Sequence, residues 1–366
     1  MTYLPAPHKS TSLYKFQLMH LNTVIFIVFL ALASGCTSTP DPKDALTSSD
    51  IAHVWPAPPA EPRIRYLRSL RSSDSVTGET KQSLRDWFLG KKEEEKLALI
   101  KPYGVHSDSE GRVYVADTGI SGLVVFDLNE KQMVYWGTSG PGALKKPTGV
   151  TTDQEGNVYV SDVLDRRVVK FDRAGNFVTA YGGSEILTSP VGLEFSDQSK
   201  KLYVVDSKKH QIIVFGQDGQ VDSTIGQRGS SDGEFNFPTN IAMDENGRLY
   251  VADTMNFRIQ IFDKDANHIK SFGKIGDGRG QFSRVKGIGV DREGHIYAVD
   301  AAFNNLQIFN DSGQLLLSLG ASGTGPGGFY LPAGAHVDRN NRIFVADQLN
   351  LRIQMFEYIG GSSAVE

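Results

Sequence analysis

The sequence predicts an all-β fold, a six-bladed β-propeller with four antiparallel strands in each blade, and three regularities lead to this prediction. An Asp recurs at intervals of 45, 44, 47, 47 and 47 residues, and a Phe stands nine residues after each Asp. A Gly stands eleven residues after each of the first five Phe residues. Repetition with a period of about 20–50 residues indicates a repeat architecture. The residues are Asp117, Asp162, Asp206, Asp253, Asp300 and Asp347; Phe126, Phe171, Phe215, Phe262, Phe309 and Phe356; and Gly137, Gly182, Gly226, Gly273 and Gly320.

Each copy of the repeat contains four short strand patterns separated by turn signals. In the fourth copy, the turn Glu245-Asn246-Gly247 separates a short apolar strand that begins at Pro238 from residues 248–252. The same copy continues with residues 258–262, a turn at 264–267 and a last strand at 268–272. Hairpin-linked strands of this kind form an antiparallel sheet. Because one small sheet cannot bury both faces alone, we expect six sheets packed radially.

The sixth copy lacks a fourth strand of its own, since eleven residues beyond Phe356 would fall past the end of the 366-residue sequence. Residues 63–70 alternate polar and apolar side chains, as the outer strands of the other copies do. We expect residues 63–70 to pair with residues 352–358 and to close the ring, which removes two exposed sheet edges. The predicted propeller therefore spans residues 63–360, with the six repeats at 101–358.

Residues 1–35 have the pattern of an export signal. Lys9 and Lys15 precede an uncharged apolar run at 24–33, which is too short to cross a hydrocarbon core of about 30 Å. The run ends in Ala33-Ser34-Gly35-Cys36, which resembles the lipobox of bacterial lipoproteins, although Leu32 stands one place earlier than in the motif. The resemblance implies lipidation of Cys36, the sole cysteine. The alternatives are a non-lipidated signal peptide, or an uncleaved anchor in which Cys36 is incidental.

The lipoprotein resemblance also implies a location. Thr37 follows the cysteine, and a residue other than Asp at this place favours the outer membrane in the lipoprotein sorting pattern. We therefore expect a lipid-anchored protein in the bacterial cell envelope, on the periplasmic face of the outer membrane, with the lipid as its membrane contact. Residues 36–62 are rich in Ser, Thr, Asp and Pro and predict a flexible tether. Residues 81–96, with Leu84, Trp87 and Phe88 at helical spacing, predict a helical insertion.

The repeat pattern resembles the NHL repeat. Copies four and six carry the pattern most fully, as Ala-Asp-x-x-Asn-x-Arg-Ile-Gln-x-Phe at 252–262 and 346–356. The Gly-rich loops at 229–235, 276–282 and 323–329 fit the Gly-x-x-Gly-x-Phe loop of the same family. The resemblance covers residues 101–358, about 70% of the chain. It implies the six-bladed fold and leaves the function open.

The repeated Asp and Phe residues favour structural roles. Each Asp ends a strand before a tight loop, where its carboxylate can accept backbone N–H groups, and the Phe residues belong to the core between blades by their period-2 alternation. The place five residues after each Asp holds an arginine in three copies, Arg167, Arg258 and Arg352. These three arginines are candidate ligand-binding residues for an anionic partner. The alternative, favoured by their recurrence in the repeat, is that each braces the loop of its own blade.

Residues that break the repeat are the better candidates for function. Directly after the first residue of each blade stand Tyr103, Thr148, Val191, Thr239, Lys286 and Ala333, which we expect to surround one mouth of a central channel. Tyr103 and Lys286, together with Tyr330 in the preceding loop, are the expected partner contacts, because aromatic residues and isolated cations are typical anchors. Three places further along, His106, Glu194 and His336 could bind a divalent metal. The alternative for these three is hydrogen-bonded packing.

Composition and motifs narrow the function classes. A formal net charge of −4 and a pI near 6.1 argue against nucleic-acid binding by bulk positive charge. One cysteine excludes a disulfide framework and any Cys-x-x-Cys site, and the sequence lacks Gly-x-Ser-x-Gly, His-Glu-x-x-His and P-loop motifs. The amidating lyase of the NHL family has zinc-binding His residues directly after the first residue of its blades, and this chain has none there.

The leading hypothesis is therefore a non-catalytic binding or scaffold module for a protein, peptide or cell-wall ligand, with no cofactor. The alternative is a metal-dependent hydrolase or lyase with its site in the central channel, because lactonase-type propellers have scattered ligands and no short signature. A stoichiometric divalent ion in the purified protein would favour the alternative.

Overall fold

The computed structural model describes residues 53–78 and 96–360. The predicted signal peptide, Cys36, most of the predicted tether and residues 81–95 of the predicted helical insertion lie outside the described residues. No helix among the described residues is long and apolar enough to cross a membrane.

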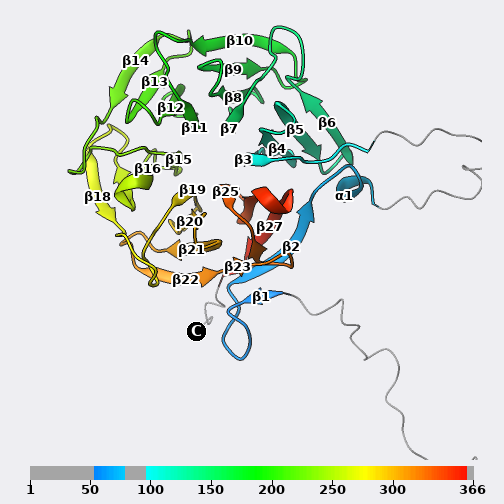
Figure 1. Cartoon of the computed structure of the whole chain (residues 1–366), viewed down its shortest axis with the longest axis vertical. Coiled ribbons are helices and arrows are strands. Elements are labelled where there is room, and N and C mark those ends of the chain that lie inside the picture. The colour runs from blue at the N-terminus through cyan, green and yellow to red at the C-terminus, as the bar shows by residue number, and fades with distance from the viewer. Residues whose placement is uncertain (1–52, 79–95, 361–366) are drawn as a thin grey trace, which may run out of the picture. The chain divides into compact units, whose positions relative to one another are not determined.

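Six antiparallel sheets are arranged around a central axis (Figure 1), each with its first strand innermost. The six-bladed propeller predicted from the repeat is confirmed. Five blades follow the order of the chain: β3(Pro102–Ser107), β4(Arg112–Asp117), β5(Gly122–Asp127) and β6(Gln132–Trp136); β7(Pro147–Thr152), β8(Val158–Asp162), β9(Arg167–Phe171) and β10(Phe177–Gly182); β11(Pro190–Ser196), β12(Lys201–Asp206), β13(Gln211–Phe215) and β14(Val221–Ile225); β15(Asn240–Met243), β16(Leu249–Asp253), β17(Arg258–Phe262) and β18(His268–Phe272); and β19(Val285–Val290), β20(Ile296–Asp300), β21(Asn305–Phe309) and β22(Leu315–Leu319).

The sixth blade combines the two ends of the described chain. It consists of β25(Pro332–Val337), β26(Arg342–Asp347) and β27(Arg352–Tyr358), followed by β2(Ile64–Leu70) from the N-terminal side. Strand β2 runs antiparallel to β27, with Ile64 opposite Tyr358 and Leu70 opposite Ile353. Ile64 and Leu70 are fully buried, so the closing strand also contributes to the core. The predicted closure of the ring by residues 63–70 is confirmed.

The Pro-rich segment before the closing strand is more ordered than an extended spacer. Strand β1(Val54–Trp55) pairs with β2, and the indole ring of Trp55 packs edge-on against Phe356 with ring centroids 5.7 Å apart. Residues 54–62 therefore belong to a hairpin with the closing strand, although their composition predicts a tether through residue 62. The contact of the partly buried Trp55 with the fully buried Phe356 outweighs the extended preference of the Pro-rich sequence.

The remaining short elements lie in the connections. They are α1(Asp74–Thr77), the 3-10 turns η3(Thr254–Asn256) and η4(Gln348–Asn350), and the parallel pair β23(Ala321–Ser322) and β24(Gly328–Phe329). The turns η3 and η4 directly follow the second strands of blades four and six. They therefore lie at the end of the propeller where the innermost strands begin.

The core is divided among the spaces between neighbouring blades. Each buried apolar cluster of the described residues joins side chains from two adjacent sheets, and this includes blades six and one. The six repeated Phe side chains are at most 1% exposed. Their predicted role as core between blades is confirmed.

Glycines in the innermost strands allow these strands to approach one another closely. An added Cβ on Gly104 would lie 2.4 Å from the carbonyl oxygen of Thr148, and one on Gly287 would lie 2.4 Å from that of Ala333. Real Cβ atoms do not come this close to backbone, so these positions of the repeat require glycine for packing around the axis. The close approach leaves a narrow channel.

The repeated Asp residues are structural, as predicted. All six are fully buried, and Asp117, for example, accepts hydrogen bonds from the backbone N–H groups of Ile100, Lys101, Gly119 and Ile120. Each of these carboxylates ties the loop that enters its blade to the turn between its second and third strands. A carboxylate that accepts several backbone N–H groups is satisfied without a counter-ion.

Candidate functional site

A channel runs along the axis of the propeller between the innermost strands. At the end that we call the opening mouth, the lining includes the second residue of five blades, namely Tyr103, Thr148, Thr239, Lys286 and Ala333. Val191, the corresponding residue of the third blade, does not line the channel. Apolar side chains, including Val105, Leu193 and Ile288, fill the middle of the channel, which encloses about 70 Å³. The turns after the innermost strands surround a wider cavity at the other end, which we call the bowl and which has a volume of about 610 Å³.

Two of the three expected partner contacts meet at the opening mouth. The Nζ atom of Lys286 lies 5.1 Å from the centroid of the Tyr103 ring, within the range of a cation–π contact. Burial raises the pKa of Tyr103, and burial together with the nearby cations of Arg284 and Lys101 lowers the pKa of Lys286. Tyr330 is 41% exposed in the loop before blade six and does not line the channel.

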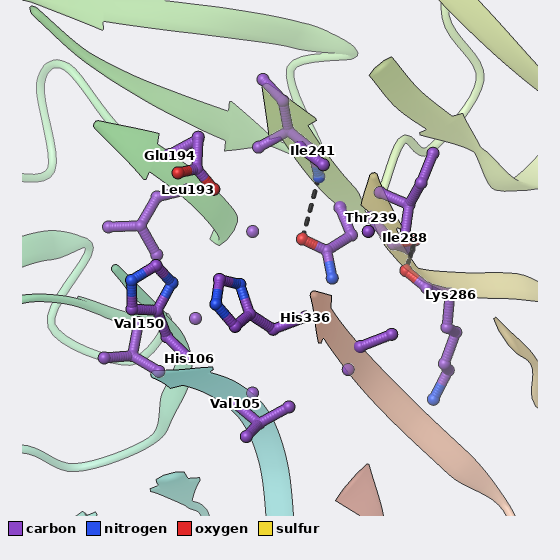
Figure 2. A pocket seen from close by; sticks show the side chains of 18 of the residues that line it. Val105, His106, Val150, Leu193, Glu194, Thr239, Ile241, Lys286, Ile288 and His336 are labelled. Atoms are coloured by element: carbon purple, nitrogen blue, oxygen red, sulfur yellow. Dashed lines mark hydrogen bonds between the residues drawn. The ribbon is translucent and has the colours of Figure 1, made fainter. Parts of the chain in front are cut away.

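The two histidines expected in the channel are in contact. The rings of His106 and His336 have centroids 4.1 Å apart, as expected for blades one and six once the ring is closed. Figure 2 shows the two rings side by side, with Glu194 apart from them on β11. The Nε2 atom of His106 lies 3.0 Å from Oγ1 of Thr152, whereas Nε2 of His336 has no hydrogen-bond partner among the described residues.

Burial keeps all three of these groups uncharged near neutral pH. Burial lowers the pKa of His106, and the neighbouring His336 lowers it further. Burial also lowers the pKa of His336, against an opposing effect of Asp338. Burial raises the pKa of Glu194 to about 8, although Thr151 donates a weak hydrogen bond to it at 3.4 Å. The channel therefore offers neutral hydrogen-bonding groups rather than a charged acid–base pair.

The three metal candidates do not form a metal-binding cluster. Within residues 53–78 and 96–360, no group of three or more His, Cys, Asp or Glu side chains is placed to hold a metal ion. His106 and His336 come together, but Glu194 does not join them. The arrangement agrees better with the packing alternative than with a three-ligand divalent site.

The three repeated arginines brace loops. The guanidinium of Arg258 donates to Asp253 and to the carbonyls of Ser231 and Glu234 at 2.7–2.9 Å. Arg352, only 3% exposed, donates to Asp347 and to three carbonyls of the loop before blade six. Arg167 donates to the carbonyl of Ala143 at 2.7 Å. These contacts favour the bracing alternative over a ring of ligand-binding arginines.

The bowl contains a second repeated Asp, which the sequence analysis did not single out. In five blades this Asp begins the turn after the innermost strand, as Asp108, Asp153, Asp244, Asp291 and Asp338. Asp244 is typical, because it accepts hydrogen bonds from the backbone and side chain of Arg248 and from the hydroxyl of Tyr250. A Tyr six residues after four of these Asp residues was the available signal. The carboxylates that dominate the bowl are therefore mostly committed to turn structure.

Family models match two parts of the chain. A model described as NHL repeat matches residues 235–262, and one described as 6-bladed beta-propeller matches residues 184–248 and 292–362. Both matches support the propeller family. A search of curated protein sequences found no match.

Solved structures share the fold at low sequence identity. A virginiamycin B lyase from Staphylococcus aureus is 14% identical, with a TM-score of 0.52 over 71% of this chain and 95% of that one. A gluconolactonase from Xanthomonas campestris is 16% identical, with a TM-score of 0.54 over 71% and 86% of the two chains. An auxiliary nutrient binding protein from Bacteroides thetaiotaomicron is 15% identical, with a TM-score of 0.57 over 72% and 70%. These likenesses establish the fold alone.

Proposed function

We propose that this chain is an envelope lipoprotein whose propeller is a non-catalytic binding module for a protein, peptide or cell-wall ligand. The lipobox-like sequence that ends in Cys36 supports the anchor. The anchor would hold the propeller at the membrane, and the propeller would present a rigid end to its partner. A protein or peptide is the favoured partner.

The observation that carries the binding role is the contact between Lys286 and Tyr103 at the opening mouth. Both residues break the repeat, and Lys286 has no ion-pair partner among the described residues. A half-buried cation beside an aromatic ring is a typical contact anchor. The repeated polar residues, in contrast, form hydrogen bonds within turns and loops. Few described polar side chains therefore remain for acid–base chemistry.

The binding role is tested with the full-length protein as bait for its partner in envelope extract. The variant Tyr103→Phe/Lys286→Gln/Tyr330→Ala removes the contact groups while it keeps most of the side-chain volume at the mouth. We expect it to weaken capture of the partner by about 1–2 kcal/mol or more without a change in the melting temperature. Undiminished capture by this variant would place the function elsewhere on the molecule.

A further inference from the structure

The opening mouth gathers cations that make no ion pair with any described residue. Lys101 and Arg284 each stand directly before the first residue of an innermost strand, at the start of blades one and five. Both are exposed, and neither they nor Lys286 make an ion pair within the described part of the chain. Asp165, a carboxylate at the same end of the propeller, is already paired with Lys145 at 2.5 Å.

Lys286 is the recessed member of this group. Its aliphatic stem lines the channel, and its Nζ atom lies over the ring of Tyr103 rather than extending into solvent. The neighbouring cations and burial both disfavour its charged form, as the lowered pKa indicates. The negative charge of an anion in the mouth would offset the mutual repulsion of Lys101, Arg284 and Lys286.

Uncharged donors complete the lining of the mouth. The Oδ1 atom of Asn240 accepts the backbone N–H of Ile241 at 2.8 Å, and the amide nitrogen of Asn240 has no partner within residues 53–78 and 96–360. The hydroxyl of Tyr103 likewise makes no hydrogen bond to any described residue. Glu194, the one carboxyl group among the described residues that line the channel, lies deeper, and burial favours its protonated form. The mouth thus offers donors and cations, which suits a carboxylate.

Exposed apolar side chains surround the mouth at a greater distance from the axis. They lie in the turns and loops at the same end of the propeller. The most exposed are Ile275 (66%), Leu164 (61%), Leu349 (59%), Ile100 (55%) and Met255 (49%). A ligand that inserts an acid into the mouth can therefore rest apolar neighbours on this rim.

We propose that the opening mouth binds an acidic side chain from an extended segment of a partner protein, with apolar residues of that segment resting on the rim. The inference rests on the proposed binding function and specifies the chemistry of its partner. A peptide fits better than an anionic bilayer, because Lys286 is recessed in the channel and only a projecting group can reach it. The carboxylate would contact Lys286, with Tyr103 and Asn240 as further donors.

The test measures binding of two labelled hexapeptides to the full-length protein by fluorescence anisotropy. One peptide alternates leucine with glutamate, and the other alternates leucine with glutamine. We expect the acidic peptide to bind at least about tenfold more tightly, and its affinity to fall when ionic strength rises from about 0.05 M to about 0.5 M. Lys286→Gln should abolish the preference and Lys286→Arg should retain part of it. Lys131→Gln, an exposed cation in a turn at the bowl end, is the matched control and should have no effect.

Three results would overturn the inference. The first is equal affinity for the two peptides, and the second is an equal loss of affinity in the Lys286 and Lys131 variants. The third is binding to phosphatidylglycerol vesicles that depends on Lys286 when the acidic peptide does not bind. One of these results can occur while the variant Tyr103→Phe/Lys286→Gln/Tyr330→Ala still fails to capture its envelope partner. In that case the proposed binding function stands, and only the inference that the partner presents an acidic side chain is refuted.

Discussion

The rings of His106 and His336 lie with their centroids 4.1 Å apart, and these residues are separated by 230 positions in the sequence but belong to neighbouring blades. Burial disfavours the charged form of both rings and outweighs the opposing effect of Asp338 on His336, and a charge on His336 disfavours protonation of His106. The folded protein therefore keeps this pair neutral, and the pair makes the stability of the propeller depend on pH.

His336→Gln should make the protein more resistant to acid. The folded state holds the pKa of His336 below its usual value, whereas the unfolded chain binds a proton below about pH 6.5. The free energy of unfolding therefore falls as the pH falls from about 6.5 through the lowered pKa. Replacement by an uncharged side chain removes this loss, so thermal midpoints measured from pH 7 to pH 4 should decline less steeply. A decline of the thermal midpoint between pH 7 and pH 4 as steep as that of the wild type would contradict this prediction.

Glu194→Gln should stabilise the protein at alkaline pH. The pKa of Glu194 is raised to about 8 in the folded state, above the unfolded value, so the folded state binds the proton more tightly. The proton on Glu194 therefore stabilises the folded state fully at pH values below the pKa of this group in the unfolded chain. This stabilisation is lost as the pH rises towards about 8. Glutamine, which cannot ionise, should raise the thermal midpoint by at least about 2 °C at pH 8 and much less at pH 4.5. Equal gains at both pH values would show that ionisation of Glu194 is not the cause.

The architecture could be predicted from the sequence, because the number of repeats gives the number of blades. The missing fourth strand of the last repeat indicates that another segment must complete the sixth blade. Ring closure makes the blades of His106 and His336 neighbours, and for this reason the two rings meet. Strand β1 was not predictable, because the stability of Val54–Trp55 as a strand comes from the contact of Trp55 with Phe356, which local composition does not encode.

The roles of polar side chains were predictable only where they repeat. The repeated Asp residues and the bracing arginines could be read from their recurrence. Glu194 lies apart from the histidine pair because of the direction in which its side chain points. The hydrogen-bond partners of the bowl carboxylates likewise depend on the conformation of each side chain. The spacing of residues along the sequence does not specify these side-chain conformations.

Arg352→Met should destabilise the protein far more than Arg167→Met. Arg352 is 3% exposed and makes four hydrogen bonds, one of them to the fully buried Asp347. Its loss would remove the cation beside Asp347, which keeps its hydrogen bonds from Tyr330, Asn350 and Gln354. It would also remove the side-chain donor to the carbonyls of Thr324 and Gly325, at a total cost of about 3 kcal/mol. Arg167 has one carbonyl contact and a longer pairing of 3.4 Å to Asp165, so about 1 kcal/mol is expected. Chemical denaturation of both variants measures the difference, and equal losses would refute the bracing role.

Cys36→Ser should release the protein from the membrane while the propeller stays folded. If the lipids on this cysteine provide the attachment, a hydroxyl in its place leaves a body with no anchor of its own. Fractionation of cells that express the variant should move the protein from the membrane pellet to the soluble fraction, with an unchanged melting temperature. A variant that stays in the pellet would show that another segment holds the protein at the membrane.

Deletion of residues 1–70 should destabilise the propeller much more than deletion of residues 1–52. The shorter deletion keeps β1 and β2, whereas the longer one removes the buried side chains of Ile64 and Leu70 and exposes the edge of β27. Burial of these two side chains and the lost strand pairing together correspond to several kcal/mol, so the melting temperature should differ by at least about 10 °C.

The same comparison tests whether the exposed edge matters in itself. An unpaired β27 offers a row of backbone N–H and C=O groups to other chains, so the longer deletion should also aggregate in proportion to its concentration. Ile64→Ala in the full-length chain is the matched control, because it removes one buried side chain while the strand pairing of β2 with β27 remains. This control should lose stability without aggregation. Equal melting temperatures for the two deletions would contradict closure of the ring by residues 64–70.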